Sequence, residues 1–249
     1  YRAPFLAHPL GFMPYASVWN LVPLPADAAG QALTLVVTSP FPQMSGRFHE
    51  IRYGHADTLL FYIITKYGMS VFFILFLLFA GVFMLVLLIV SRSIRAWTLM
   101  YLGAFSILIG LWILAESRML QFVTGNQFVH ASLAYVSLAL LPIAMVLYIR
   151  EIVSSKYHRL LSWLKIMYYV NFVLIVALQL LDIYSFFQTV IITHAAILIG
   201  IVVCLYVIIQ ESVKAKNRDA LHLLLSFSVL PVFGLIEMIV FYTADFSQT

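Results

Sequence analysis

The sequence predicts an integral membrane protein of the all-α class: a bundle of six transmembrane helices preceded by the C-terminal strands of an extracytoplasmic β-sandwich. Of the 249 residues, 63% are hydrophobic and 10% are charged, whereas soluble domains are about 45–50% apolar and about 25% charged. Six apolar stretches are each long enough to cross a hydrocarbon core of about 30 Å as a helix. The composition therefore excludes a soluble domain for most of the chain.

Residues 1–55 differ from the rest and are interpreted as the C-terminal part of that β-sandwich. β-branched or alternating runs, separated by prolines and glycines, are typical of short strands. The predicted strands are residues 17–22, 32–39 and 47–53. Because three strands need a covered face to be stable, we expect earlier strands before Tyr1. Residues 56–68 predict a short interfacial linker helix.

The transmembrane bundle is predicted to occupy residues 69–249. Its connections are short, so neighbouring helices are expected to pack antiparallel. The predicted spans are residues 69–91, 97–117, 127–149, 160–181, 187–210 and 220–243.

The basic residues predict the orientation of the bundle. They concentrate in the first, third and fifth connections, whereas the second has only Arg118 and the fourth has none. Those in or next to the odd connections are Arg92, Arg95, Arg150, Lys156, Arg159, Lys165, Lys214, Lys216 and Arg218. Since cytoplasmic loops carry the excess of basic residues, Tyr1 and Thr249 are both expected outside the cytoplasm. The same loops account for the net charge of +4, so no nucleic-acid partner is expected.

Ionisable residues in the outer half of the spans define the candidate site, because such residues in a bilayer usually serve a function. They are Glu116, His130, Asp182, His194 and Glu237. We expect Glu116, His194 and Glu237 to line an outward-opening polar cavity for a small ligand. Trp112, one helical turn from Glu116, is a further candidate for its wall. The alternative is that Glu116, His130 and Asp182 only reach interfacial water. For His194 and Glu237 both possibilities stay open.

The sequence contains no catalytic or metal-binding motif. Gly-rich phosphate loops, nucleophile elbows, HExxH and CxxCH are all absent, so neither enzymatic activity of this segment nor a metal or other cofactor is expected. His130 and His194 could in principle bind haem from two helices, but no spacing motif supports this.

Prolines and glycines within the spans predict local geometry. Pro142 and Pro231 each remove a backbone donor and are hinge candidates, although neighbouring helices can also tolerate such prolines. Glycines of the spans, among them Gly103, Gly110 and Gly200, are expected to let helices approach closely.

Four segments carry a resemblance to a known family. They are SVWNLVPLP (17–25), QALTLVVTSPF (31–41), IRYG (51–54) and TLMYLGAFSILIGLWILAES (98–117). In this order they resemble bacterial seven-transmembrane receptors with diverse intracellular signalling modules. The resemblance implies an external jelly-roll-like domain, similar to carbohydrate-binding modules, and seven spans in the bacterial inner membrane. A seventh span and a cytoplasmic output module would then follow Thr249.

The resemblance implies a sensor that relays the binding of an extracytoplasmic small molecule or carbohydrate. The expected output is a GGDEF-type diguanylate cyclase on the same chain, with histidine kinases and phosphatases as other outputs of the family, and the expected assembly is a homodimer. The alternative function is a small-solute transporter or permease, which would use broken helices and polar residues near the bilayer centre. Asn171 and Gln179 are polar residues of the fourth span, but no Gly/Pro pair predicts a broken span.

Overall fold

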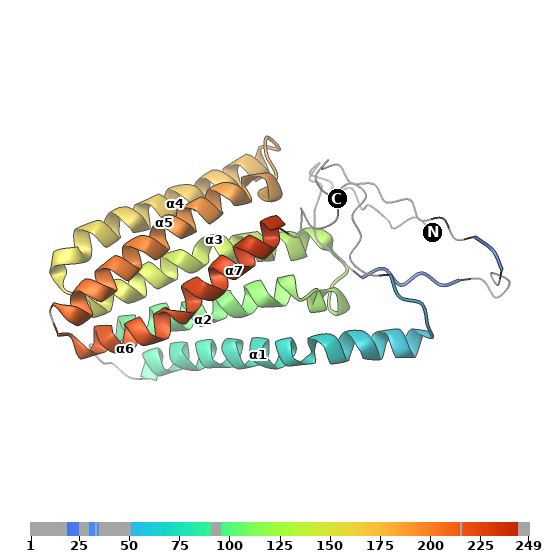
Figure 1. Cartoon of the computed structure of the whole chain (residues 1–249), viewed down its shortest axis with the longest axis horizontal. Helices are drawn as coiled ribbons and strands as arrows, with labels where there is room; N and C mark the ends of the chain where they lie inside the picture. The colour runs from blue at the N-terminus through green and yellow to red at the C-terminus, as the bar shows by residue number, and fades with distance from the viewer. Residues whose placement is uncertain are drawn as a thin grey trace.

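The computed structural model describes residues 19–24, 30–32, 34, 51–90, 96–214 and 216–243. Figure 1 shows long helices lying side by side, with their connections gathered at two opposite ends. The α-helices are α1 (Ala56–Val90), α2 (Ala96–Glu116), α3 (Gln127–Ile152), α4 (His158–Leu180), α5 (Phe186–Val213), α6 (Arg218–Phe227) and α7 (Val229–Thr243). Two short 3-10 helices, η2 (Met119–Phe122) and η3 (Ser155–Tyr157), lie in connections.

Six helical segments of the described chain are long and apolar enough to cross a membrane. Each overlaps one predicted span, so the predicted helical membrane bundle is confirmed. The sixth segment, Arg218–Ile236, combines α6 with most of α7. The described parts of residues 1–55 contain no strand, and the rest of the predicted strands lies outside the described residues. The β-sandwich therefore stays a prediction.

Helix α1 is longer than the first predicted span. It runs for 35 residues without interruption, so residues 56–68 continue directly into the span instead of forming a separate helix. The only glycine near that boundary is Gly68, and one glycine in a helix costs only about 1 kcal/mol relative to alanine. A helix of this length measures about 50 Å, so α1 extends beyond a hydrocarbon core of about 30 Å.

Glycines let α1 and α2 pack closely. A Cβ atom on Gly81 would lie 2.8 Å from the carbonyl oxygen of Gly103, and one on Gly103 would lie 3.0 Å from the carbonyl oxygen of Gly81. A Cβ on Gly110 would meet the side chain of Leu78 at 3.0 Å. The two helix backbones therefore touch at the Gly81–Gly103 pair, which explains why a side chain larger than hydrogen is absent from both positions.

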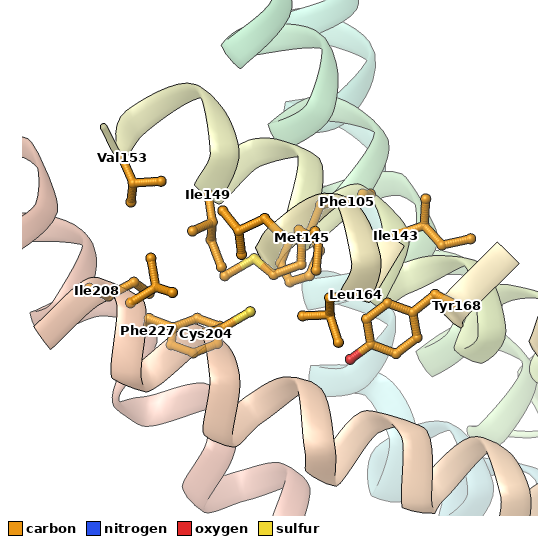
Figure 2. Close-up of a cluster of buried hydrophobic side chains, with 14 of the residues drawn as sticks. Phe105, Ile143, Met145, Ile149, Val153, Leu164, Tyr168, Cys204, Ile208 and Phe227 are labelled. Atoms are coloured by element: carbon orange, nitrogen blue, oxygen red, sulfur yellow. The ribbon is translucent and has the colours of Figure 1, made fainter. Parts of the chain in front are cut away.

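The main hydrophobic core lies between α3, α4, α5 and α6. Helix α3 is central, because it contacts α2, α4 and α5. Ile149, Leu161 and Ile208 are fully buried in this core. Figure 2 shows side chains of α3, α4 and α5 converging there. Ile149 and Ile208 lie near the C-terminal ends of α3 and α5, and Leu161 lies near the start of α4. The core therefore sits toward the end of the bundle that carries the α3–α4 and α5–α6 connections.

The sixth span has one irregular residue but no break. Helix α6 ends at Phe227 and α7 begins at Val229, while Ser228 between them keeps helical backbone angles and donates its N–H to the carbonyl oxygen of Leu224 at 2.9 Å. Pro231 explains the position of the irregularity, because proline cannot donate to the carbonyl of Phe227 and its ring clashes with that group. In contrast, α3 continues through the buried Pro142 without such an irregularity. Neither observation tests whether these sites act as hinges.

Candidate functional site

The predicted site residues of α2 lie beside aromatic and polar side chains near the C-terminal end of that helix. Trp112 is half-buried, and Glu116, the last residue of α2, is exposed and interacts electrostatically with Tyr135 of α3. The Tyr135 ring stacks on Phe186, the first residue of α5, with centroids 5.7 Å apart. The backbone N–H of Phe186 donates to Oε1 of Gln179 in α4 at 2.8 Å. The ends of α2, α3, α4 and α5 therefore meet around Tyr135.

His194 lies in α5 beside Thr193, which forms a polar seam with α4. Its side chain is buried, and the adjacent Thr193 accepts a hydrogen bond from Nδ2 of Asn171 at 3.2 Å. Oδ1 of Asn171 is buried and has no partner among the described residues. Glu237 belongs to α7, but its side chain lies outside the described residues. The cavity that would join Glu116, His194 and Glu237 therefore stays a prediction.

Substitutions of Thr193 and Asn171, the two hydrogen-bonding partners in the seam, are expected to lower the free energy of unfolding by unequal amounts. Thr193→Val keeps the side-chain shape but leaves both amide atoms of Asn171 unpaired, so it is expected to lower the free energy of unfolding by about 1–2 kcal/mol. Asn171→Leu is expected to cost less, because the Thr193 hydroxyl can turn to a carbonyl of its own helix. Reversible unfolding in mixed detergent micelles measures both values. An equal loss for the two variants would contradict this account.

His130 and Asp182 have different environments, although both were considered as residues that reach interfacial water. Asp182 is exposed and has a φ of 55°, and it ends α4 as the left-handed residue of the α4–α5 turn. His130 is only 2% exposed, and its Nε2 lies 2.8 Å from the carbonyl oxygen of Thr124. The water-facing interpretation of His130 is therefore wrong, since its ring is used to hold the α2–α3 connection. No group of metal ligands occurs in the described part of the chain.

A junction that the sequence analysis missed joins the N-terminal segment to the bundle. We define the Trp19 junction as Trp19, Lys66, Tyr67, Arg118 and Gln121. The backbone N–H of Trp19 donates to Oε1 of Gln121, and Nε2 of Gln121 donates to the carbonyl oxygen of Trp19, both at 2.7 Å. The indole meets the Tyr67 ring edge-on at 6.1 Å between centroids. Arg118 and Lys66 lie 5.5 and 5.9 Å from the indole centroid.

The favourable contacts of the Trp19 junction are partly offset by the cost of one buried N–H group. Each hydrogen bond contributes about 0.5–1.5 kcal/mol, and each cation–π contact about 0.5–1 kcal/mol at a partly exposed site. Against this, Nε1 of Trp19 is buried and has no acceptor among the described residues, which costs about 1–3 kcal/mol. The gains together exceed this cost by about 1–2 kcal/mol, so the contact has a modest net stability.

A second missed cluster lies at the opposite end of the bundle. Glu211 of α5 is 3% exposed, and its carboxylate accepts a hydrogen bond from the Ser154 hydroxyl at 2.5 Å. Asn217 caps α6 by accepting from the backbone N–H groups of residues 219 and 220, and its Nδ2 donates to the carbonyl oxygen of Ile152 at 3.2 Å. Glu211 follows the buried Cys204 and Val207 at helical spacing, and this periodicity could have revealed it.

Removing the hydroxyl that pairs with Glu211 should destabilise the protein. Ser154→Ala leaves a buried carboxylate without this donor and is expected to cost about 1.5–3 kcal/mol, the value of a hydrogen bond to a charged group. Glu211→Gln keeps an acceptor and is expected to cost less. Ser212→Ala is the control, because the Ser212 hydroxyl only bonds the carbonyl oxygen of Ile209 in its own helix. Thermal unfolding in detergent would contradict the account if Ser154→Ala were as mild as this control.

Comparison with known proteins adds one match. A family model described as 7TM diverse intracellular signalling matches residues 67–248, which is well over half of the chain and includes most of the first span and all of the other five. No curated protein and no solved structure matches the chain.

Proposed function

The chain belongs to the 7TM diverse intracellular signalling family, and from this premise we propose that it is the sensor region of a receptor that relays an extracytoplasmic signal to a cytoplasmic output module. The six spans form a multi-pass transmembrane signalling region and not a catalytic domain. The family match over most of the first span and all of the other five is the observation that carries the proposal. The contact between the N-terminal segment and the bundle supports it, because a relay needs such a contact.

The proposed orientation places the N-terminal segment outside the cytoplasm. The α3–α4 and α5–α6 connections lie at one end of the bundle, opposite the α2–α3 connection and the α4–α5 turn (Figure 1). Basic residues concentrate in the first pair, with Lys156 and Lys214 among them, whereas Arg118 is the one basic residue of the second pair. The positive-inside rule then places the first pair in the cytoplasm. In a bacterium the membrane would be the inner membrane.

Cysteine labelling tests this orientation. Native Cys204 is 3% exposed and should give little background. A cysteine replacing Val123, which is 83% exposed in the α2–α3 connection, should react with a membrane-impermeant maleimide added to intact cells. A cysteine replacing the exposed Ser155 should react only after the membrane is permeabilised. The reverse pattern would overturn the orientation.

The proposed relay needs parts beyond the sequence in hand. We propose earlier β-strands before Tyr1, and a seventh span and an output module after Thr249, with a diguanylate cyclase as the favoured output and a homodimer as the signalling assembly. The ligand would be a small molecule or carbohydrate bound by the external domain or by the outer end of the bundle. Such a ligand shifts the output only by binding one arrangement of the helices more tightly than the other.

Transport of a small solute is the second candidate function, and one observation favours it. The sixth span is irregular at Ser228, and irregular or discontinuous helices line the substrate sites of many transporters. Solute uptake into proteoliposomes separates the two functions, because the receptor proposal predicts no uptake of a mixture of labelled amino acids and sugars above empty liposomes. Concentrative uptake would favour transport.

A further inference from the structure

We infer that the Trp19 junction is a releasable latch that couples the N-terminal segment to α1 and to the α2–α3 connection at the same time. The inference deepens the proposed receptor role by naming the contact through which the relay enters the bundle. It can be measured without ligand or output module, so its failure and the failure of the receptor proposal are distinguishable.

The first part of the latch is the pair of hydrogen bonds between Gln121 and Trp19. These bonds fix the direction of the N-terminal segment, because they bind its main chain. Gln121 pairs with both the N–H and the carbonyl of Trp19, 102 residues away in the sequence. This reciprocal pairing fixes the position and orientation of the Trp19 backbone relative to η2. A displacement of the segment along its own axis must therefore pull on Gln121 or break both hydrogen bonds.

The α2–α3 connection, which contains Gln121, is held in place by hydrogen bonds of its own. Arg118 begins η2 with a φ of 60°, a conformation that costs energy for a residue with a side chain. The Ser117 hydroxyl donates to the carbonyl oxygen of Leu114 at 2.9 Å, and the buried His130 lies 2.8 Å from the carbonyl oxygen of Thr124. The connection is thus tied to α2 at one end and to α3 at the other, so a force on Gln121 reaches both helices.

The second part of the latch uses the indole ring. Tyr67 and Lys66 of α1 lie against one part of the ring system, and Arg118 of the α2–α3 connection lies near the same indole. Trp19 is therefore the shared contact of two elements that are distant in sequence. Helix α1 runs without a break from this point to Val90 and touches α2 backbone to backbone at Gly81, so it can carry a displacement as a rigid rod.

One feature makes the latch releasable. The buried Nε1–H of Trp19 has no acceptor in the described part of the chain, and undocking would return it to water. The cation–π contacts of Arg118 and Lys66 with the indole are lost at the same time. The buried N–H therefore favours the released state, whereas the cation–π contacts and the paired Gln121 amide favour the docked one.

Hydrogen–deuterium exchange of the intact protein in lipid nanodiscs tests the latch. Gln121→Leu removes only the amide that holds the Trp19 backbone. We expect amide exchange to become about tenfold faster in residues 117–126 and also in residues 56–68, to which Gln121 is joined through Trp19. Trp19→Ala should accelerate exchange in the same two regions. Residues 158–180 of α4 should be unchanged, which verifies that the bundle remains folded.

Matched controls separate coupling from local damage. Gln188→Leu removes another glutamine that bonds a main-chain N–H, that of Ser185, and Trp97→Ala removes an exposed tryptophan of α2. Neither control should change exchange in residues 56–68. Unchanged exchange in residues 56–68 of both Gln121→Leu and Trp19→Ala would overturn the coupling, whether or not residues 117–126 respond. Equal acceleration by the controls would overturn it as well.

Discussion

Gly200→Ala is expected to give the largest loss of stability of any single methyl addition in the described bundle. A Cβ atom at this position would overlap the Tyr168 side chain, whose hydroxyl group and ring carbon Cζ occupy that space. Tyr168 is 2% exposed and packed in the main core, as Figure 2 shows, so the ring has no free room to retreat. We expect the free energy of unfolding in mixed micelles to fall by about 3 kcal/mol, the upper part of the range for overpacked cores.

A rescue variant identifies the cause of that loss. Tyr168→Leu removes the clashing atoms, so the double variant with Gly200→Ala should be more stable than the sum of the two single effects predicts. Gly234→Ala is the matched control, because a Cβ there meets nothing within 4 Å. That change should be neutral or stabilising by up to about 1 kcal/mol. Additive effects of Gly200→Ala and Tyr168→Leu would show that the close α4–α5 contact is not responsible.

Gly81→Ala is expected to separate α1 from α2. The added Cβ would lie 2.6 Å from Cγ1 of Ile107 and 2.8 Å from the carbonyl oxygen of Gly103. The second contact is with backbone, which cannot move without shifting the whole helix. We expect a loss of about 2–3 kcal/mol in the free energy of unfolding and faster hydrogen–deuterium exchange along α1.

Gly68→Ala is the control for this second prediction, because it lies in the same helix and its Cβ would meet nothing within 4 Å. It should be neutral or slightly stabilising, since alanine is the better helix former. If Gly81→Ala were as harmless as Gly68→Ala, the close crossing of α1 and α2 would not exist in the membrane.

The helical spans could be predicted from the sequence because length and hydropathy alone determine whether a helix can cross a bilayer. The residues at which the helices begin and end were harder to predict. Helix α1 extends through residues 56–68 since no residue there prevents it, and the sixth span becomes irregular at Ser228 because Pro231 blocks the carbonyl of Phe227. The proline was visible in the sequence, but whether neighbouring helices re-satisfy its missing hydrogen bond depends on tertiary packing.

The polar contacts were mostly not predictable, because they depend on distances between elements. Contact of His130 with interfacial water was one of the alternatives for this residue, yet its ring is turned inward to the carbonyl of Thr124. Glu211 lies one residue beyond the predicted fifth span, 187–210, although its spacing from Val207 places it on the buried face. Trp19 and Gln121 pair across 102 residues, and no local pattern reports such a contact.

The central claim is that this chain is the sensor region of a receptor, and peptide mapping of the native full-length protein by mass spectrometry tests it most directly. The account predicts a seventh apolar span after Thr249, followed by a soluble signalling module whose activity can then be assayed. A protein that ended near Thr249, or that continued into further spans without a soluble module, would contradict the receptor proposal and make transport the leading function.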